Sequence, residues 1–511
     1  MDRKRGLAMV VVALGLASSV AATPAVADEP AFQVEWGACP SDVNARATPL
    51  QCASVSVPLD YTDPEGAEIK IMLSRLASPN PSKRRGVLLL NPGGPGGSGL
   101  SMPADLFSLG VPASVLDSYD LIGMDTRGVG HSSPVSCGFT VDQGYSGNIP
   151  PYAVDDAAVA EQAKIAEAVA KQCARDGRLR HVSTANMARD LDRIRAALGE
   201  DKASFLGYSY GSALGAAYAS MFPERSDRIV LDSNVGDTFL DRDGMRRFGL
   251  GAEQAFPDFA KWAAARHDAY GLGRTPEEVR NTYFTLAERL DKTPVGEIDG
   301  TTFRLGTFAG LYRESSYAMT AQQWQALLNF DEAAVQRPLG LSPYDNAWSV
   351  FLAVTCNDVD WPEDVRTYQR GVAEDRQKYP LFGAAGANIT PCAYWQYEPA
   401  EPPVKITDDG PRNVLIMQNL RDPATPHRGG VMLKEKFGQR SQLVSVNESG
   451  HGVYVFDDNP CALNIATTYL VDGKLAPRDT FCQASRTSGL TLDRDAQQRR
   501  AEALDRLPRT F

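Results

Sequence analysis

Two kinds of segment alternate along most of the chain. Short apolar runs rich in Val, Ile and Leu end at a glycine or a small polar residue, and segments with helical spacing of apolar positions follow them. Runs that are apolar on both faces are typical of parallel strands covered by helices on both sides. The predicted strands are 87–91, 119–125, 203–207, 228–232, 413–418 and 443–446, and the predicted core helices are 186–198, 211–222, 428–437 and 462–470. The pattern predicts an α/β sandwich with a mostly parallel sheet.

The alternation stops between residues 234 and 405. This stretch shows helical spacing at 252–270, 276–290 and 321–330, and it contains no convincing buried strand. It also holds five of the six tryptophans, so we expect a packed lobe. Because it interrupts the sheet between late strands, we predict a helical cap over the carboxyl edge of the strands, where open α/β sheets bind ligands. The expected organisation is a sheet core from 28–233 and 406–482, a cap at 234–405 and a charged C-terminal tail at 483–511.

The first 27 residues have the pattern of a cleaved export signal. Basic residues at 3–5 precede an apolar run at 7–20, and Ala25-Val26-Ala27 supplies the small-x-small pattern that signal peptidase cuts after. A transmembrane anchor is the alternative, but the run is short for a hydrocarbon core of ~30 Å and a cleavage site follows it. We therefore expect a secreted, extracellular protein that has no membrane association once the signal is removed.

The charge balance is acidic. The full chain carries 52 Lys and Arg against 63 Asp and Glu, and removal of residues 1–27 leaves 49 against 62, a net charge of −13. Such a surface argues against nucleic acid or an anionic membrane as a partner.

Eight cysteines accompany the export signal, which favours a disulfide framework. We predict that neighbours in the sequence pair, and the alternative is that some of the cysteines are free buried thiols. None forms a Cys-x-x-Cys motif, so zinc and thioredoxin-like redox sites are not expected, and we predict neither a metal nor a cofactor. The predicted pairs are Cys39–Cys52, Cys137–Cys173, Cys356–Cys392 and Cys461–Cys482.

The segment 207–211 reads Gly-Tyr-Ser-Tyr-Gly between a predicted strand and a predicted helix. This is the strand–turn–helix setting of a G-x-S-x-G nucleophile elbow, in which a sharp turn raises the serine oxygen above the sheet. We therefore predict Ser209 as a nucleophile; the alternative is a serine that only caps the helix.

A serine hydroxyl needs a base to take its proton, and the chain has five histidines. His451 lies between two glycines directly after the last predicted core strand, so its loop can reach the serine. The orienting acid is expected after the preceding strand, where Asp422 lies, and Glu448 is the rival because it is three residues from His451. The resulting order, Ser209, Asp422 and His451, is that of the α/β hydrolases.

A glycine-rich loop at 91–98 follows the first predicted core strand. Glycines let backbone N–H groups approach a developing oxyanion closely, whereas Pro92 and Pro95 have no N–H to donate. We predict the N–H groups of Gly94 and Tyr210 as the oxyanion hole. A phosphate-binding loop is the weaker alternative because the Lys-Ser/Thr ending is absent.

Four motifs together resemble those of the proline iminopeptidase clan and, more closely, those of the secreted bacterial tripeptidyl aminopeptidases. They are the glycine loop at 93–97, the Asp-x-Arg-Gly-x-Gly-x-Ser segment at 125–132, the elbow at 207–211 and the Asp-Pro-x-Thr-Pro segment at 422–426. The resemblance runs from about residue 36 to Cys482 and leaves the C-terminal tail unexplained. It implies an α/β-hydrolase fold and release of short peptides, often tripeptides, from free N-termini.

The resemblance also implies cap carboxylates that hold the substrate ammonium. Glu253 and Asp358 are the candidates, and a solvated or salt-bridged surface acid is the alternative for each. Asp125 and Arg127 are expected to close a turn beside the site without taking part in the chemistry.

The leading hypothesis is a serine aminopeptidase that acts on peptides with free N-termini through an acyl-enzyme intermediate. A secreted carboxylesterase with the same triad is the second hypothesis. A catalytically inactive binding protein is the third, and the complete triad and glycine loop argue against it.

Overall fold

The computed structural model describes residues 34–506, except 44–47, 141–142, 144, 146, 331–344 and 485–493. The predicted export signal lies outside the described residues. Among the helices that are described, none is long and apolar enough to cross a membrane.

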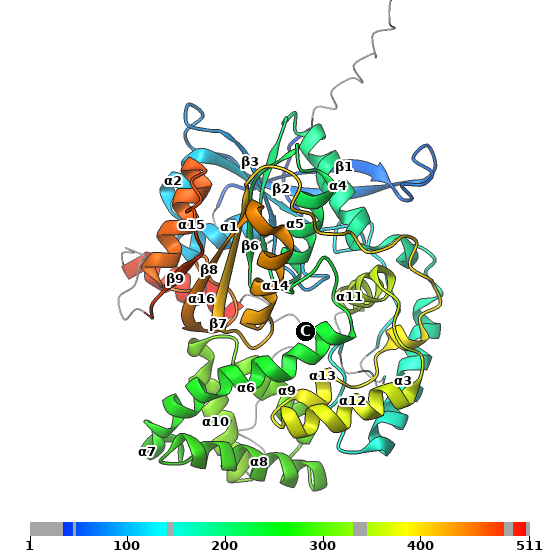
Figure 1. Ribbon diagram of the computed structural model, residues 1–511, viewed down its shortest axis with the longest axis vertical. Coiled ribbons are helices and arrows are strands. Elements are labelled where there is room, and N and C mark those ends of the chain that lie inside the picture. The colour runs from blue at the N-terminus through cyan, green and yellow to red at the C-terminus, as the bar shows by residue number, and fades with distance from the viewer. Residues whose placement is uncertain are drawn as a thin grey trace, which may run out of the picture. The chain divides into compact units, whose positions relative to one another are not determined.

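A mostly parallel sheet, with nine strands in the described part of the chain, organises the fold (Figure 1). Its order is β1-β2-β4-β3-β5-β6-β7-β8-β9; β2 runs antiparallel to both of its neighbours, and every other pair is parallel. The strands are β1 (Gln51–Pro58), β2 (Glu68–Leu76), β3 (Gly86–Asn91), β4 (Tyr119–Met124), β5 (Ala203–Tyr208), β6 (Ser226–Asp232), β7 (Val414–Arg421), β8 (Ser441–Ser449) and β9 (Thr480–Cys482). The six predicted strands correspond to β3 through β8, so the predicted sheet is confirmed.

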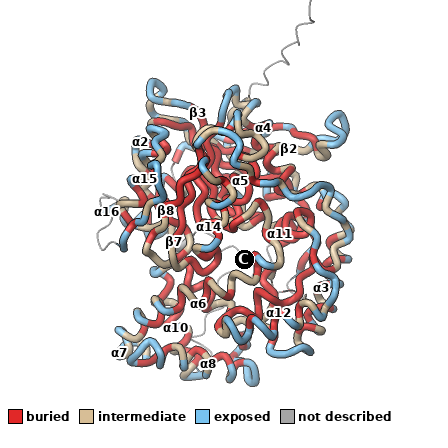
Figure 2. The backbone as a smooth tube through the Cα atoms, viewed as in Figure 1, coloured by how far each residue is buried: buried red, intermediate tan, exposed pale blue. Residues whose placement is uncertain are grey.

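Successive strand residues enter two different cores. In β3, Val87 and Leu89 pack into the core on one face, whereas Leu88 and Leu90 pack into the core on the other. The first face is covered by α4 (Thr184–Ala197), α5 (Tyr210–Met221) and α14 (His427–Phe437), and the second by α1 (Met102–Leu109), α2 (Ala113–Ser118) and α15 (Pro460–Asp472). Burial on both faces explains why these strands are apolar throughout (Figure 2).

The segment between β6 and β7 is helical, with no strand among its described residues. Its main helices are α6 (Arg242–Ala264), α7 (His267–Tyr270), α8 (Pro276–Lys292), α9 (Gly300–Gly310), α10 (Tyr317–Leu328), α11 (Asp345–Asp358), α12 (Val365–Lys378) and α13 (Gly383–Gly386). The rings of Phe256, Phe259, Tyr283 and Phe303 surround Trp324 at centroid distances of 5.2–6.2 Å. We call this segment the helical insertion.

Helix α3 (Asp156–Cys173) precedes α4 in sequence but packs against the helical insertion. Its Val159 and Ala163 lie in one apolar cluster with Tyr368 and Val372 of α12. A segment from the first half of the chain therefore completes the insertion, a contact that local sequence patterns do not reveal.

Part of the C-terminal tail forms a helix, α16 (Arg494–Arg506). The guanidinium of Arg500 donates to the carbonyls of Leu109, Val455 and Phe456 and pairs with Asp458 at 2.9 Å. The tail helix thus docks beside α1.

All four predicted disulfides are confirmed. Cys39–Cys52, Cys137–Cys173, Cys356–Cys392 and Cys461–Cys482 are bonded, and no cysteine in the described residues is free. The alternative of free buried thiols is therefore wrong.

Candidate active site

Ser209 occupies a strained turn between β5 and α5. Its backbone has φ 56° and ψ −124°, a conformation that a residue with a side chain adopts at a cost. A Cβ on Gly207 would lie 2.3 Å from the Gly211 carbonyl oxygen, so this tight turn requires glycine there. The Ser209 N–H donates to the Asp232 carbonyl at 2.9 Å, which fixes the turn to the end of β6.

The glycine loop lies directly against this turn. A Cβ on Gly93, which has φ 99°, would lie 2.9 Å from the Ser209 Cβ and 3.3 Å from the Tyr210 nitrogen. Gly94 lines a hollow together with Ser209 and Tyr210. Within the described residues, the N–H groups of Gly94 and Tyr210 have no hydrogen-bond acceptor assigned, so both are available to an oxyanion.

The structure brings Asp422 and His451 together. The His451 Nδ1 lies 3.0 and 2.9 Å from the two carboxylate oxygens of Asp422, which is fully buried. The carboxylate also accepts hydrogen bonds from the N–H groups of Ala424 and Thr425 and from the Thr425 hydroxyl, at 2.8–2.9 Å. Asp422 is therefore held in one orientation and can fix the tautomer of the histidine.

Ser209 and His451 line the same hollow, although no hydrogen bond joins Oγ to the ring among the described residues. Such bonds are often long before substrate binds. Glu448, the rival acid, accepts a hydrogen bond from the Asn459 side chain at 3.2 Å, and it is Asp422 that contacts His451.

Asp232 holds the histidine loop, and the sequence reasoning did not find it. Its buried carboxylate accepts hydrogen bonds from the N–H groups of Val453 and Tyr454 at 2.9 and 2.7 Å. The neighbouring Ser233 hydroxyl accepts from the Gly452 N–H at 2.8 Å. Burial raises the pKa of Asp232 to about 7. An acidic residue directly after the apolar run 229–231, at the carboxyl end of β6, is the signal that could have identified it.

Asn419 and Asp457 also stabilise the loop that carries His451. The Asn419 side chain donates to the carbonyls of Gly450 and Gly452 at 3.1 and 3.3 Å. Asp457 Oδ2 and Asn419 Oδ1 are buried acceptors without a donor in the described part of the chain, and the two side chains interact. Burial raises the pKa of Asp457 well above its usual range, and a proton on its carboxyl group would supply the missing donor.

The helical insertion reaches the catalytic loop through Tyr312. Its carbonyl accepts the His451 N–H at 2.9 Å, and its ring lies 5.0 Å from the imidazole. The insertion therefore helps to position His451.

Two hollows meet at Ser209. The oxyanion-side hollow is lined by Gly94, Ser209, Tyr210, Val235, Arg247 and Phe351, among others. The histidine-side hollow is lined by Gly93, Ser209, Met102, Tyr312, His451 and Phe456, among others. Their volumes are about 40 and about 80 Å³, so a bound peptide has to displace some of the side chains that line them.

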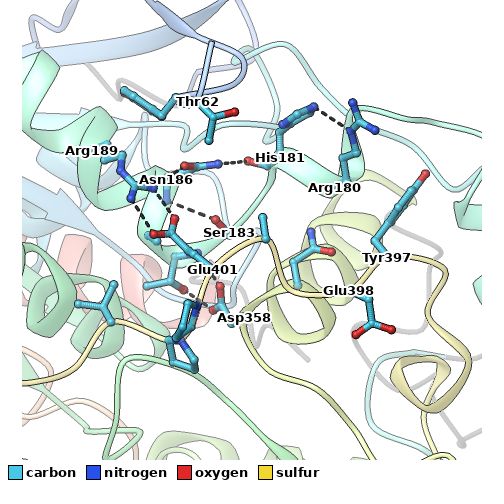
Figure 3. A pocket seen from close by; sticks show the side chains of 18 of the residues that line it. Thr62, Arg180, His181, Ser183, Asn186, Arg189, Asp358, Tyr397, Glu398 and Glu401 are labelled. Carbon is cyan, nitrogen blue, oxygen red and sulfur yellow. Dashed lines mark hydrogen bonds and ion pairs between the residues drawn. The ribbon is translucent and has the colours of Figure 1, made fainter. Parts of the chain in front are cut away.

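A larger cavity of about 560 Å³ is lined by Ser183, Asn186 and Tyr397, among others (Figure 3). Asp358 lines it, and its carboxylate accepts the N–H and hydroxyl of Thr184 at 2.8 and 2.6 Å. The same Thr184 hydroxyl contacts the Tyr210 hydroxyl at 2.6 Å, which links the elbow to Asp358. Burial raises the pKa of Asp358 to about 7, and no cation among the described residues pairs with it. We call this space the outer cavity.

Glu253 lies elsewhere. Its carboxylate pairs with Arg280 at 2.9 Å and accepts the Leu381 N–H at 2.9 Å, and it lines neither hollow at Ser209 nor the outer cavity. The structure thus brings Asp358 near the elbow but gives Glu253 a partner within the insertion.

Asp125 and Arg127 stabilise the turn beside the glycine loop. Asp125 accepts the Ser98 hydroxyl at 2.5 Å and the His131 N–H at 2.8 Å, and the Arg127 guanidinium pairs with Asp190 at 2.6 Å. Both side chains are buried, in keeping with the expected structural role. In the described residues, no cluster of three or more His, Cys, Asp or Glu could hold a metal ion.

Comparisons with known proteins identify the family of this chain. The sequence model of the family described as the alpha/beta hydrolase fold matches residues 86–458. The tripeptidyl aminopeptidase of Streptomyces lividans is 36% identical over 472 residues, which cover 88% of this chain and 86% of that protein. The serine protease Hip1 and the carboxylesterase B of Mycobacterium tuberculosis are each 29% identical over 88% of this chain and cover 91% and 90% of their own lengths. The chain belongs to the alpha/beta hydrolase family and, within it, to the tripeptidyl aminopeptidase family of serine peptidases.

Proposed function

We propose that this protein is an exported aminopeptidase that releases short peptides, most often tripeptides, from free N-termini. The observation that carries the proposal is the arrangement at the sheet edge, where Asp422 orients His451 beside a strained Ser209. The 36% identity to a tripeptidyl aminopeptidase supports the substrate class.

The chemistry follows from these positions. His451 takes the proton of Ser209, whose Oγ attacks the scissile carbonyl, and the N–H groups of Gly94 and Tyr210 stabilise the oxyanion. His451 then gives the proton to the leaving amine. Water, activated by the same base, releases the acyl peptide.

Recognition of a free N-terminus requires a carboxylate, because a buried ammonium without a counter-ion is costly. Asp358 is our candidate. It lacks a cationic partner in the described residues, and only the Thr184 hydroxyl separates it from the Tyr210 hydroxyl. Glu253 is the second candidate, but its ion pair with Arg280 already neutralises it.

The test compares kcat/KM for a tripeptide p-nitroanilide with that for its N-acetyl form. Asp358→Asn should remove most of the preference for the free form, a loss of about 2–5 kcal/mol of recognition, whereas Glu253→Gln should preserve it. The preference should also grow as the pH rises through about 7, because Asp358 ionises there. Equal cleavage of free and blocked substrates by the wild type would reject the aminopeptidase.

A carboxylesterase is the second candidate, favoured by the relative of that name at 29% identity. Esters with the same acyl groups as the anilides distinguish the two functions. An esterase should hydrolyse the esters and leave the anilides intact.

A further inference from the structure

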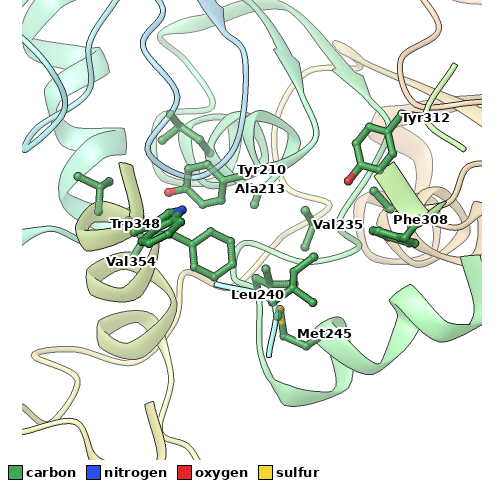
Figure 4. Close-up of a cluster of buried hydrophobic side chains, with 14 of the residues drawn as sticks. Tyr210, Ala213, Val235, Leu240, Met245, Phe308, Tyr312, Trp348 and Val354 are labelled. Atoms are coloured by element: carbon green, nitrogen blue, oxygen red, sulfur yellow. The ribbon is translucent and has the colours of Figure 1, made fainter. Parts of the chain in front are cut away.

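Arg247 is the one charged side chain among the described residues that line the oxyanion-side hollow. The other lining residues are glycines, uncharged polar residues and apolar side chains; Figure 4 labels four of them, Tyr210, Val235, Leu240 and Tyr312. The terminal nitrogen Nη2 of Arg247 donates to the Val235 carbonyl at 3.0 Å. It also lies 3.3 Å from where a Cβ on Gly244 would be, so the guanidinium lies at the wall of the hollow.

No carboxylate neutralises this cation in the described residues. Three aspartates lie close enough to act on it, but each is engaged elsewhere: Asp237 pairs with Lys436, Asp241 accepts the Gly244 N–H at 2.7 Å, and Asp243 pairs with Arg242 at 3.7 Å. The next residue along α6 towards its N-terminus, Arg246, shows the contrast, because it pairs with Asp375 at 2.6 Å.

Partial burial of an unpaired guanidinium is unfavourable, and this desolvation lowers the pKa of Arg247. The guanidinium has five N–H donors in a planar fork that matches a carboxylate, and one donor is used by Val235. An anion bound in the hollow would neutralise the guanidinium and offset the cost of leaving it unpaired.

The position of His451 indicates which part of the substrate lies there. The base has to protonate the leaving amine, so the leaving group lies in the histidine-side hollow. The acyl part of the substrate then lies towards Gly94, Tyr210 and Arg247.

We propose that Arg247 binds an acidic side chain of the peptide to be released, at the residue whose carbonyl Ser209 attacks. This proposal rests on the proposed function only in taking Ser209 as the nucleophile. It assigns to this site a preference for Asp or Glu over Asn or Gln.

The test uses tripeptide p-nitroanilides that carry Glu or Gln at each of the three positions in turn. In the wild type, Glu at the position next to the anilide should raise kcat/KM about 10-fold or more relative to Gln, since hydrogen bonds to charged groups are strong. Arg247→Met should abolish that ratio and Arg247→Lys should retain part of it. Arg428→Gln, which removes an exposed cation nearby, should leave the ratio unchanged.

Three results would overturn the proposal. The first is a Glu-to-Gln ratio near one in the wild type. The second is an equal loss on Glu and Gln substrates in Arg247→Met, which would mean that Arg247 holds a neutral carbonyl or only supports the fold. The third is an Arg247-dependent preference for a free C-terminal carboxylate over an amide on the leaving side, measured with tetrapeptides.

Failure of the proposed function is recognised separately. The ratios can be measured on N-acetyl substrates, or on tripeptide p-nitrophenyl esters if no anilide is cleaved. The Arg247 assignment is therefore tested whether the enzyme proves to be an aminopeptidase, an endopeptidase or an esterase.

Discussion

The carboxyl edge of the sheet and the helical insertion both contribute residues around Ser209, but their polar groups differ in how many partners they have. At the sheet edge, the acid and the loop that carries the base have several partners: Asp422 has four donors, including the His451 ring, and the histidine loop is held by Asp232, Ser233 and Asn419. In the insertion, neither Arg247 nor Asp358 has an ion-pair partner among the described residues.

The difference separates two tasks. The acid and the base must be oriented before the substrate arrives, so Asp422 and the histidine loop are held by several hydrogen bonds. Groups that select a substrate can remain unpaired, because the substrate supplies the missing partner. The sheet edge corresponds to the first task and the insertion to the second.

The sharpest test of the sheet-edge assignment is Ser209→Ala. Loss of the nucleophile should lower kcat by ~10⁴-fold or more while the melting temperature stays close to that of the wild type. Ser220→Ala, on the same helix, is the control and should remain active, because its hydroxyl bonds only the Ala216 carbonyl. Wild-type turnover by pure, folded Ser209→Ala would show that Ser209 is not the nucleophile.

Two disulfides offer a paired comparison of the regions. Cys356–Cys392 anchors α11, which carries Phe351 of the oxyanion-side hollow, whereas Cys461–Cys482 joins α15 to β9. Replacing either pair with alanines should lower the free energy of unfolding by about 2–4 kcal/mol. Only the first replacement should also raise KM for peptide anilides. If both replacements alter KM equally, the division between chemistry and selection is wrong.

The last prediction concerns the proton on Asp457. Its raised folded-state pKa means that the native state holds a proton that the unfolded state has lost. The stabilisation is complete below about pH 4 and declines as the pH rises, with a slope of about 1.4 kcal/mol per pH unit for each such proton. Asp457→Asn cannot titrate and donates to Asn419 at every pH, so its stability should decline less between about pH 4.5 and 7.5.

Urea unfolding across this pH range measures the effect. Asp268→Asn, whose side chain is 95% exposed, is the control and should keep the wild-type slope. Parallel slopes for Asp457→Asn and the wild type would show that Asp457 is ionised in the folded protein. The pKa values of Asp232 and Asp358 are also raised, to about 7. These two groups should therefore lower the free energy of unfolding as the pH rises, both in Asp457→Asn and in the wild type.

The sequence by itself determined the features that local pattern encodes. Parallel strands buried on both faces are continuous apolar runs, so β3 to β8 were predicted within a few residues, and cysteines close in sequence were paired correctly. The order of the predicted triad followed from the strands that precede each residue. The hairpin of β1 and β2 was missed because β1 alternates buried and exposed residues, and β9 was missed because it is only three residues long.

Only the tertiary structure decided which distant segments meet. Tyr312, Asp232 and Asn419 reach the histidine loop from three separate parts of the chain, and no local spacing in the sequence indicates such contacts. The tertiary structure also decides which charged side chains find a partner. Arg246 and Arg247 are adjacent in sequence, yet Arg246 pairs with Asp375 and Arg247 lines the oxyanion-side hollow. The reason is that successive helical residues point in directions about 100° apart. A side chain's partner depends on what packs against its face of the helix, and that is decided by the fold.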